Sequence, residues 1–296
     1  MGYGSISWSV FLSPPPQGGD KYIFYLHFYS NLAKIRYMLE FAKNLARDAG
    51  SLALGYYKEG INQRFKSDPT DVVTDADIAV SDFIIEKIKE TYPEHGIISE
   101  ESEENINETA EYVWVVDPID GTRNFAKHIA FWCTMIGITK NGEPYVGVVY
   151  DAINDELFYA ERNKGAYLDG KKITVSNHKE VEHSFLVFSL GVVDENSSYN
   201  PDRFAEYQKF YNNLIGDNGH WTHNYGSMLE SCHLAAGRID VVINSCALYW
   251  DYLAPYVICT EAGAKWTDCE GKKWEKGKMD IVVANPNLHK KLLELF

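Results

Sequence analysis

Two aspartates lie three residues apart in residues 117–122, a segment that reads Asp-Pro-Ile-Asp-Gly-Thr. The aromatic and β-branched residues just before it predict a buried strand, which places Asp117 at the carboxyl end of that strand. Pro118 cannot prolong a ladder, so we expect a turn there that brings the Ile119 carbonyl and the Asp120 carboxylate beside the first aspartate. Three oxygen ligands would then converge.

These residue types indicate a site for a hard metal cation next to a phosphate group. Oxygen-only ligands select Mg²⁺, Mn²⁺ or Ca²⁺ over zinc, and phosphate is the usual partner of protein-bound Mg²⁺. Gly121 and Thr122 are expected to begin a helix, whose free N–H groups and positive dipole end favour an anion. The alternative is a surface turn, because Asp, Pro and Gly all form turns readily.

Two other acidic segments help to separate these interpretations. One is Ser-Glu-Glu-Ser at residues 99–102, and the other is Trp-Asp at 250–251 with Glu-Ala-Gly at 261–263. Alone, Glu100 fits a solvated acidic loop, since further acidic residues follow it. Alone, Asp251 fits the N-cap of an amphipathic helix, although the positive end of a helix is an unfavourable place for a cation. Only the combination of three segments favours a metal site.

Together the three segments resemble the motifs of the inositol monophosphatase family and occur in that family's order. The resemblance covers the chain from about Met38 to its end. It implies an α/β (mixed α+β) fold, the layered αβαβα sandwich of the inositol monophosphatase and fructose-1,6-bisphosphatase type. It also implies a lithium-sensitive, Mg²⁺-dependent phosphomonoesterase, commonly a homodimer.

The resemblance further implies which residues bind metal. The matching ligands are Glu100, Asp117, the Ile119 carbonyl, Asp120 and Asp251. They would hold two or three Mg²⁺ ions, with Mn²⁺ as a possible substitute and with Ca²⁺ and Li⁺ as inhibitors. Two ions about 4 Å apart clamp the attacking and leaving oxygens of an in-line displacement, which needs no covalent phosphoenzyme.

The resemblance assigns catalytic roles to Thr122, Asp77 and Glu100. Thr122 matches the residue that orients the attacking water, and Asp77 matches its hydrogen-bond partner. A simpler role for Asp77 is also open, because Thr74 precedes it by three residues and the pair fits a capping box. Both roles can coexist.

Substrate contacts are implied for a second set of residues: Gly121, Thr122, Gly226, Ser227, Asn244 and Asp251. Inositol-specific relatives have a glutamate where this chain has Asn244, and an amide loses the stronger charge-assisted hydrogen bonds to sugar hydroxyls. Met228 replaces a smaller residue and would narrow the pocket. The sequence predicts hydrolysis of a small phosphate monoester, an inositol phosphate or a related sugar or polyol phosphate. 3′(2′),5′-bisphosphate nucleotidase and fructose-1,6-bisphosphatase activities are alternatives.

An alternative of another class is a non-catalytic, metal-bound scaffold or regulatory protein. Such a protein would be expected to lose at least one metal ligand. Every matching ligand is present in this chain, so the sequence favours the enzyme.

Composition limits the partners that we expect. The formal net charge of −14 opposes nucleic acid binding, and the partner is expected to be a small phosphorylated metabolite. Five cysteines without a Cys-x-x-Cys pair are typical of a reducing compartment, which predicts a cytoplasmic protein. The aromatic run at residues 22–29 is too short to span a bilayer, which needs about 20 residues, so no membrane association is expected.

Composition also changes along the chain. Residues 1–37 are predicted to be an accessory or non-native N-terminal extension, and residues 38–296 the phosphatase domain. Within that domain, 38–173 would carry the metal site and an antiparallel sheet, and 174–296 would be an α/β half. A helix is predicted to begin at Met38 and to end at Gly60.

Local signals predict several further elements. Asn-Gly at 141–142 and Asp-Gly at 169–170 indicate tight hairpins. Pro201 begins an expected helix that ends at Ile215. Ser227 and Glu230 fit a capping box ahead of another helix.

Overall fold

The computed structural model describes residues 19–60, 63–65, 72–102, 105–190, 201–215, 222–245 and 247–296. Internal contacts divide the chain into two units, Met1–Phe41 and Ala42–Phe296, which are described separately. In the part of the chain that the structure describes, no helix is both long and apolar enough to cross a bilayer.

Helix α1 spans Gly19–Glu59, and its upstream part belongs to the first unit. The prediction that this helix begins at Met38 is wrong. The sequence between Gly19 and Met38 contains neither glycine nor proline, so nothing there breaks a helix. Its predicted end is confirmed, because Gly60 follows with a left-handed φ of 122°. Residues 1–18 of the predicted extension lie outside the described residues.

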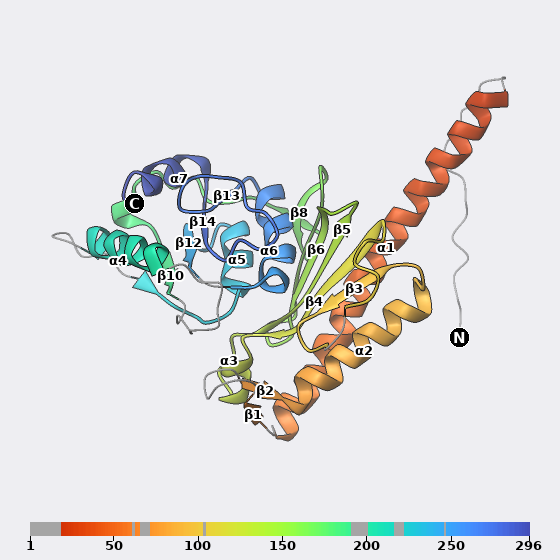
Figure 1. The fold of residues 1–296 in the computed structure, drawn as a ribbon, viewed down its shortest axis with the longest axis horizontal. Coiled ribbons are helices and arrows are strands. Elements are labelled where there is room, and N and C mark those ends of the chain that lie inside the picture. Colours follow the sequence, from red (N-terminus) through yellow and green to blue (C-terminus); the bar gives the residue numbers. More distant parts are fainter. Residues whose placement is uncertain are drawn as a thin grey trace. The chain divides into compact units, whose positions relative to one another are not determined.

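A mixed seven-stranded sheet forms one layer of the second unit (Figure 1). Its strands run in sequence order: β3 Gly96–Ser99, β4 Tyr112–Asp120, β5 Cys133–Lys140, β6 Glu143–Asp151, β7 Glu156–Glu161, β8 Gly165–Leu168 and β9 Lys171–Ile173. β3 is parallel to β4, and every later pair in this sheet is antiparallel. The parallel pair matters for the site, because it places the carboxyl ends of β3 and β4 at the same edge.

Both predicted hairpins are confirmed. Asn141 and Gly142 connect β5 to β6 with φ values of 52° and 79°. Asp169 and Gly170 connect β8 to β9 with φ values of 47° and 80°. Two consecutive residues with positive φ are the requirement of the two-residue type I′ turn.

The second sheet has five strands in the order β11-β10-β12-β14-β13, and it is also mixed. Its strands are β10 Leu186–Ser189, β11 Thr222–His223, β12 Val241–Asn244, β13 Lys265–Thr267 and β14 Ile281–Ala284. The remaining elements are β1 Gln63–Phe65, β2 Val72–Thr74, α2 Asp75–Thr91, α3 Thr122–Ala126, the 3₁₀ turn η1 Val181–His183, α4 Pro201–Ile215, α5 Leu229–Ala235, α6 Tyr249–Glu261 and α7 Pro286–Leu293. The prediction for α4 is confirmed.

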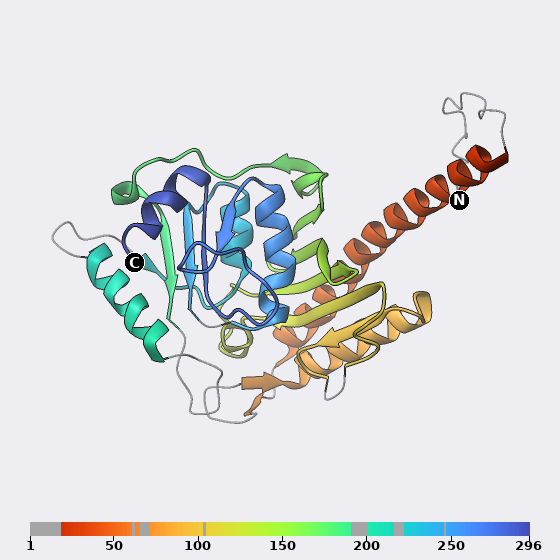
Figure 2. The same cartoon turned by 45° about the horizontal axis from the view of Figure 1, so that its top comes forward.

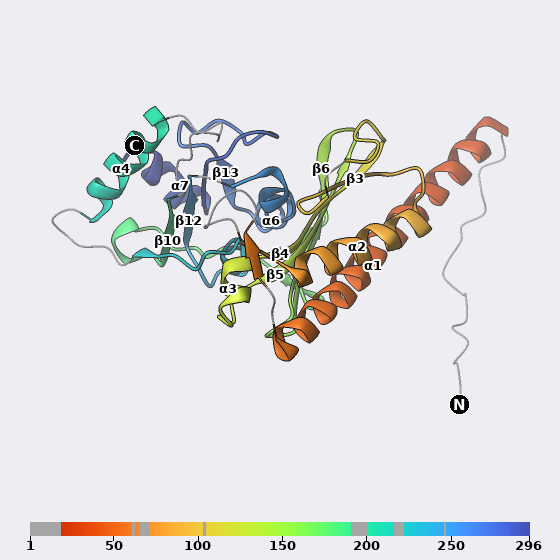
Figure 3. The same ribbon diagram turned by 60° about the horizontal axis from the view of Figure 1, so that its bottom comes forward.

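Helices and sheets alternate in five layers. Helix α2 packs on β4 on one face of the first sheet, and α6 packs on β4 to β8 on the other (Figure 3). Helices α5 and α6 lie between the two sheets, and α4 and α7 cover the far face of the second sheet (Figure 2). The predicted layered αβαβα sandwich is therefore confirmed. Its larger core lies between the sheets, where Leu253 and Ala254 of α6 meet Gly137 and Gly147 so closely that a Cβ at either glycine would collide with them.

Candidate functional site

The end of β4 differs from the predicted turn. The strand continues through Pro118 to Asp120, and the expectation that it ends at Asp117 is wrong. The register with β5 shifts between Asp117 and Asp120, so a bulge absorbs the residue that cannot donate a ladder hydrogen bond. The Pro118 carbonyl still accepts a bond of 2.9 Å from the Thr134 hydroxyl. The bulge nevertheless keeps both aspartates at the edge of the sheet.

Three carboxylates meet at this edge. Glu100 follows β3, Asp117 lies on β4, and Asp251 lies in the first turn of α6. One oxygen from each lies within 4.8 Å of the others, although Asp251 comes from a segment 134 residues beyond Asp117 (251 − 117). The N-cap residue of α6 is Leu248 and not Asp251, as one interpretation of the sequence had it. Asp251 instead satisfies the N-cap backbone, because its Oδ2 accepts the Leu248 N–H at 2.5 Å. The structure thus brings together three of the five predicted ligands.

The carboxylates of this group repel one another when no cation lies among them. Burial raises the pKa of Asp117 well above its usual range, and the neighbouring carboxylates of Glu100, Asp120, Asp251 and Asp77 raise it further. Asp117 is 1% exposed, and its Oδ1 has no hydrogen-bond partner among the described residues. A buried anionic oxygen without a donor is costly, and a divalent cation is the partner that such a group accepts.

Asp120, a fourth predicted ligand, lies on the same strand but is held by other donors. Its Oδ2 accepts the hydroxyl of Ser227 and, at 3.4 Å, the thiol of Cys133. Burial raises the pKa of Asp120 to about 6, and these hydrogen bonds oppose the rise. The orientation of Asp120 is thus set by a loop from the other half of the chain.

Thr122 and Asp77 lie side by side, as predicted. The Thr122 hydroxyl is 3.2 Å from Asp77 Oδ1 and 2.9 Å from the Ile119 carbonyl, and its single proton serves one of them. The other oxygen of Asp77 accepts the Thr74 N–H at 2.8 Å and the Thr74 hydroxyl at 2.5 Å. Asp77 therefore caps α2 and contacts Thr122 at once. Burial raises its pKa to about 6.

Two glycines, Gly121 and Gly226, allow the start of α3 to lie close to the segment that precedes α5. Gly121 is the N-cap of α3 with φ 85°, and a Cβ at this position would lie 3.0 Å from the Cβ of Ser227. Gly226, with φ 67°, precedes that serine. Two predicted substrate-binding residues thus lie in contact across the two halves of the chain. The predicted capping box at Ser227 is wrong, because Met228 is the N-cap residue of α5 and the serine hydroxyl is directed to Asp120.

Asn244 ends β12, where its side-chain amide lies 3.8 Å from the sulfur of Met228. The two residues singled out for substrate selectivity are therefore neighbours. Both are at least partly buried.

Sequence reasoning missed two residues that contribute to this region. Asn124 lies in α3, just after the first motif, and its side chain donates to the carbonyls of Phe131 at 2.8 Å and Tyr225 at 2.6 Å. Glu230 is 1% exposed, and burial raises its pKa to about 8.

A second acidic group differs in its surroundings. Ligand atoms of Asp151, Glu156 and His233 also lie within 4.8 Å of one another. Arg238, however, donates to both oxygens of Glu156 at 2.6 Å, and Asp151 accepts the N–H groups of residues 153 and 154. The fold supplies its own donors here, so we do not consider it a metal site.

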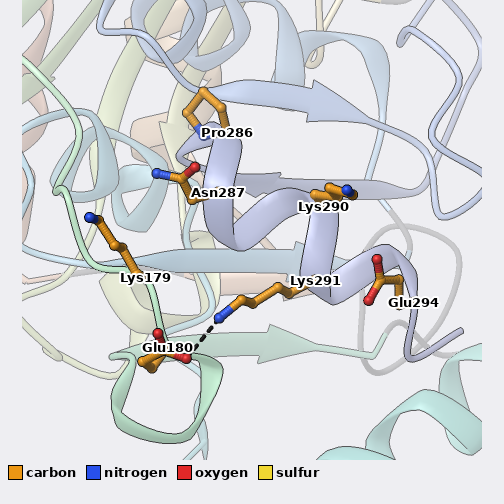
Figure 4. A pocket seen from close by; sticks show the side chains of 7 residues that line it. All are labelled: Lys179, Glu180, Pro286, Asn287, Lys290, Lys291 and Glu294. Atoms are coloured by element: carbon orange, nitrogen blue, oxygen red, sulfur yellow. Dashed lines mark hydrogen bonds and ion pairs between the residues drawn. The ribbon is translucent and has the colours of Figure 1, made fainter.

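A separate hollow of about 420 Å³ lies beside α7 (Figure 4). It is lined by Lys179, Glu180, Pro286, Asn287, Lys290, Lys291 and Glu294. Its Lys291–Glu180 ion pair of 2.7 Å joins two largely exposed side chains. Such pairs contribute little, and this hollow has none of the buried polar chemistry of the Asp117 edge.

Comparisons with known proteins agree with the fold and the motifs. A model of the inositol monophosphatase family matches residues 34–296. Inositol-1-monophosphatase of Bacillus subtilis (strain 168) is 35% identical over 258 residues, 86% of this chain and 94% of that protein. Nus factor SuhB of Pasteurella multocida (strain Pm70) is 34% identical over 257 residues, again 86% and 94%. The crystal structure of extragenic suppressor protein suhB from Bartonella henselae superposes with a TM-score of 0.78 at 28% identity, covering 87% of this chain and 97% of that one.

A match over most of the chain, joined to the layered fold, defines a phosphoric monoester hydrolase. The chain belongs to the inositol monophosphatase family. The resemblance inferred from the three motifs is confirmed.

Proposed function

We propose that this chain hydrolyses a small phosphate monoester with Mg²⁺ as its cofactor. The observation that carries the proposal is the buried edge where Glu100, Asp117 and Asp251 converge while Asp117 Oδ1 lacks a donor. Carboxylate oxygens are the ligands that Mg²⁺ prefers, and the mutual repulsion that raises the pKa of Asp117 is relieved by a divalent cation. The residues present therefore fit the metal.

Five groups would hold the metal: Glu100, Asp117, the Ile119 carbonyl, Asp120 and Asp251. When bound, Mg²⁺ supplies charge neutralisation for the phosphate and lowers the pKa of water. The Ile119 carbonyl already accepts a bond from Thr122, but a carbonyl oxygen has a second lone pair for a cation. Mn²⁺ would substitute for Mg²⁺ on the same ligand chemistry, and inhibition by Ca²⁺ and Li⁺ is part of the proposal.

Thr122 and Asp77 would orient the attacking water. The Thr122 hydroxyl donates its hydrogen bond to Asp77 or to the Ile119 carbonyl, so its oxygen lone pairs are free to accept a hydrogen bond from the attacking water. The hydrogen bonds from Thr74 hold Asp77 in place for this role. Glu100 would complete the catalytic set as a ligand at the edge of the site. Backbone N–H groups of Gly121 and Thr122 would contact the phosphate.

The substrate class that we propose is an inositol phosphate or a related sugar or polyol phosphate. A Bacillus subtilis relative is named inositol-1-monophosphatase, which supports this class. Asn244 and Met228 would form the wall that faces the alcohol part of the substrate, beside Gly226 and Ser227. Fructose 1,6-bisphosphate and 3′(2′),5′-bisphosphate nucleotides are the substrates to compare.

Phosphate release from p-nitrophenyl phosphate and a sugar phosphate panel, with Mg²⁺ and with EDTA, tests the reaction. We expect activity only with Mg²⁺. Equal hydrolysis in EDTA, or no hydrolysis of any monoester, would contradict the proposal.

Changing Asn244 to glutamate tests the substrate wall. Asn244→Glu should raise kcat/KM for myo-inositol 1-phosphate about fivefold relative to a second sugar phosphate, because a charge-assisted hydrogen bond adds about 1 kcal/mol over a neutral one. Asn287→Glu, at an exposed position in the first turn of α7, is the control. An unchanged ratio in Asn244→Glu would remove this residue from the wall.

A second candidate function is a scaffold role in transcription. The Pasteurella multocida relative is named a Nus factor, and it covers the same span of this chain at similar identity. Every proposed metal ligand is present here, so the scaffold role would accompany hydrolysis rather than replace it. Co-purification with transcription proteins from the source cells, compared between wild type and Asp117→Asn, tests this role separately from hydrolysis.

A further inference from the structure

Two segments that are far apart in the sequence meet at one oxygen of Asp120. The Ser227 hydroxyl donates to Asp120 Oδ2, and the Cys133 thiol donates to the same oxygen at 3.4 Å. Cys133 is the first residue of β5, whereas Ser227 lies two residues before α5. Because a carboxylate is planar, donors that fix one of its oxygens also fix the direction of the other. The positions of the two segments therefore decide how Asp120 is presented.

A single side chain joins these two segments. The amide nitrogen of Asn124 donates to the carbonyl of Phe131 at 2.8 Å and to that of Tyr225 at 2.6 Å. An amide nitrogen carries two hydrogens, so it can bond two carbonyls at once, whereas a hydroxyl can bond only one. Phe131 lies two residues before Cys133, and Tyr225 lies two residues before Ser227. Asn124 thus holds each segment at the same distance along the chain from its donor to Asp120.

The contacts around Asn124 make this connection firm. The next residue, Phe125, is fully buried and packs edge-on against Trp132, with ring centroids 4.9 Å apart. On the other side of the amide, the rings of Phe131 and Tyr225 stack with centroids 4.8 Å apart. The amide therefore has a packed base, and the two peptide groups that it bonds cannot separate without also breaking a ring contact.

We propose that Asn124 is a positioning residue that aligns Asp120 for the cation. It acts through Ser227 and Cys133, whose segments it holds together, and it supplies no atom to the metal or to the substrate. The inference rests on the proposed metal-dependent hydrolysis, because Asp120 is one of the proposed ligands.

Two substitutions in the full chain, alone and combined, test this role. Asn124→Leu keeps the branched shape of the side chain but removes both donors. Ser227→Ala removes the hydroxyl through which Asn124 is proposed to act. The double variant measures whether the two effects depend on each other.

Asn285→Leu is the matched control. The amide nitrogen of Asn285 also donates to the carbonyl of a distant segment, that of His178 at 2.8 Å, and Asn285 is likewise buried. It caps α7, on the far face of the second sheet. The same substitution there should lower the melting temperature and leave Mg²⁺ binding unchanged.

The first readout is the Kd for Mg²⁺ alone, measured by calorimetry on EDTA-treated, dialysed protein without substrate. We expect a Kd about tenfold weaker in Asn124→Leu, because the hydrogen bonds that align a ligand are lost. In the Ser227→Ala background, the same substitution should weaken the Kd by only about threefold or less, since its main route to Asp120 is already absent. The second readout is hydrogen exchange in EDTA, which Asn124→Leu should accelerate in both 129–133 and 224–228.

Two outcomes would overturn the inference. Wild-type Mg²⁺ affinity in Asn124→Leu, even with a lower melting temperature, would show a role in stability alone. A full tenfold further loss in the Ser227→Ala background would show that the two residues act independently. If Asn124→Leu does not fold, Asn124→Ser replaces it in the single and double variants, because one hydroxyl cannot serve both carbonyls.

The same measurements separate this inference from the proposed function. A wild-type protein that binds Mg²⁺ but hydrolyses no monoester refutes the function and leaves the calorimetric comparison intact. A wild-type protein with Mg²⁺-dependent hydrolysis, together with unchanged Mg²⁺ affinity in Asn124→Leu, refutes the positioning role alone.

Discussion

Two clusters of side chains each bring three ligand atoms within 4.8 Å of one another, and their surroundings differ: the first is Glu100, Asp117 and Asp251, and the second is Asp151, Glu156 and His233. In the first, burial and four neighbouring carboxylates all raise the pKa of Asp117, whose Oδ1 has no donor among the described residues. In the second, Arg238 binds both oxygens of Glu156 and lowers its pKa, which burial opposes. A fold can supply a counter-charge to a carboxylate group or leave that task to a ligand. The comparison favours the first group over the second as the proposed cation site.

The largest expected effect comes from removing the central carboxylate. Asp117→Asn should lower phosphatase turnover at least a thousandfold, about 4 kcal/mol, and should raise the melting temperature in EDTA because a repelled buried charge is lost. Glu156→Gln should keep full activity and lose about 1 kcal/mol of stability, because Arg238 loses a charged partner. Turnover and thermal unfolding check both variants. Similar losses of activity in the two would remove the distinction between the groups.

The next effect concerns the carboxylate that arrives from α6. Asp251→Asn should lower turnover about a hundredfold at saturating Mg²⁺, because an anionic ligand becomes neutral while the bond to the Leu248 N–H can persist. Asp151→Asn is the control from the second group and should retain activity. The comparison needs kcat across a Mg²⁺ titration. More than about a tenth of wild-type turnover in Asp251→Asn would show that it is not a ligand.

A smaller effect is expected at Thr122 and Asp77, the residues proposed to orient the attacking water. Thr122→Ala should reduce turnover about tenfold to fiftyfold with little change in the Kd for Mg²⁺, because the hydroxyl orients water and holds no ion. Asp77→Asn should behave alike. Calorimetry and steady-state kinetics together separate these effects. If Asp77→Asn lost only about 1 kcal/mol of stability and kept its turnover, Asp77 would serve α2 as a cap and nothing more.

The smallest effect, and the sharpest contrast, is the pH dependence of stability in EDTA. The pKa of Asp120 is raised to about 6, so its folded form binds a proton more tightly than the unfolded chain, and stability is lost as pH rises from about 4 to 6. Asp120→Asn should remove this loss. Glu156 has a lowered pKa, so its stabilisation is present above its ordinary pKa and is lost on acidification.

Urea unfolding of wild type, Asp120→Asn and Glu156→Gln between pH 4 and 7 measures both slopes. The free-energy differences from wild type should change with pH in opposite directions. Slopes of the same sign would contradict the assignment of one group as repelled and the other as neutralised.

Local signals were sufficient for several parts of this chain. The Asn141–Gly142 and Asp169–Gly170 turns, the cap of α2 by Thr74, and the end of α1 at Gly60 all follow from residues adjacent in sequence. The motifs also indicated the family. Each of these depends on backbone preferences or on bonds spanning a few residues, which a single sequence displays directly.

Other features could not be predicted locally. β4 continues through Pro118 because the neighbouring strand accommodates a bulge, and the capping box expected at Ser227 is displaced because its hydroxyl meets Asp120, 107 residues away. No residue adjacent to Glu156 in the sequence indicates that its partner is Arg238, which lies 82 residues further along the chain. Long-range pairing outweighed the local preference in each case.

The sequence by itself determined the chemistry that this protein can offer: carboxylate and carbonyl oxygens that suit a hard cation, a helix start after Gly121, and an overall charge of −14. Only the tertiary structure decided which acidic residues lie together without a counter-charge and which are paired with arginine. The physical reason is that the pKa and the ligand capacity of a carboxylate depend on burial and on neighbours that sheet register and helix packing bring from distant segments.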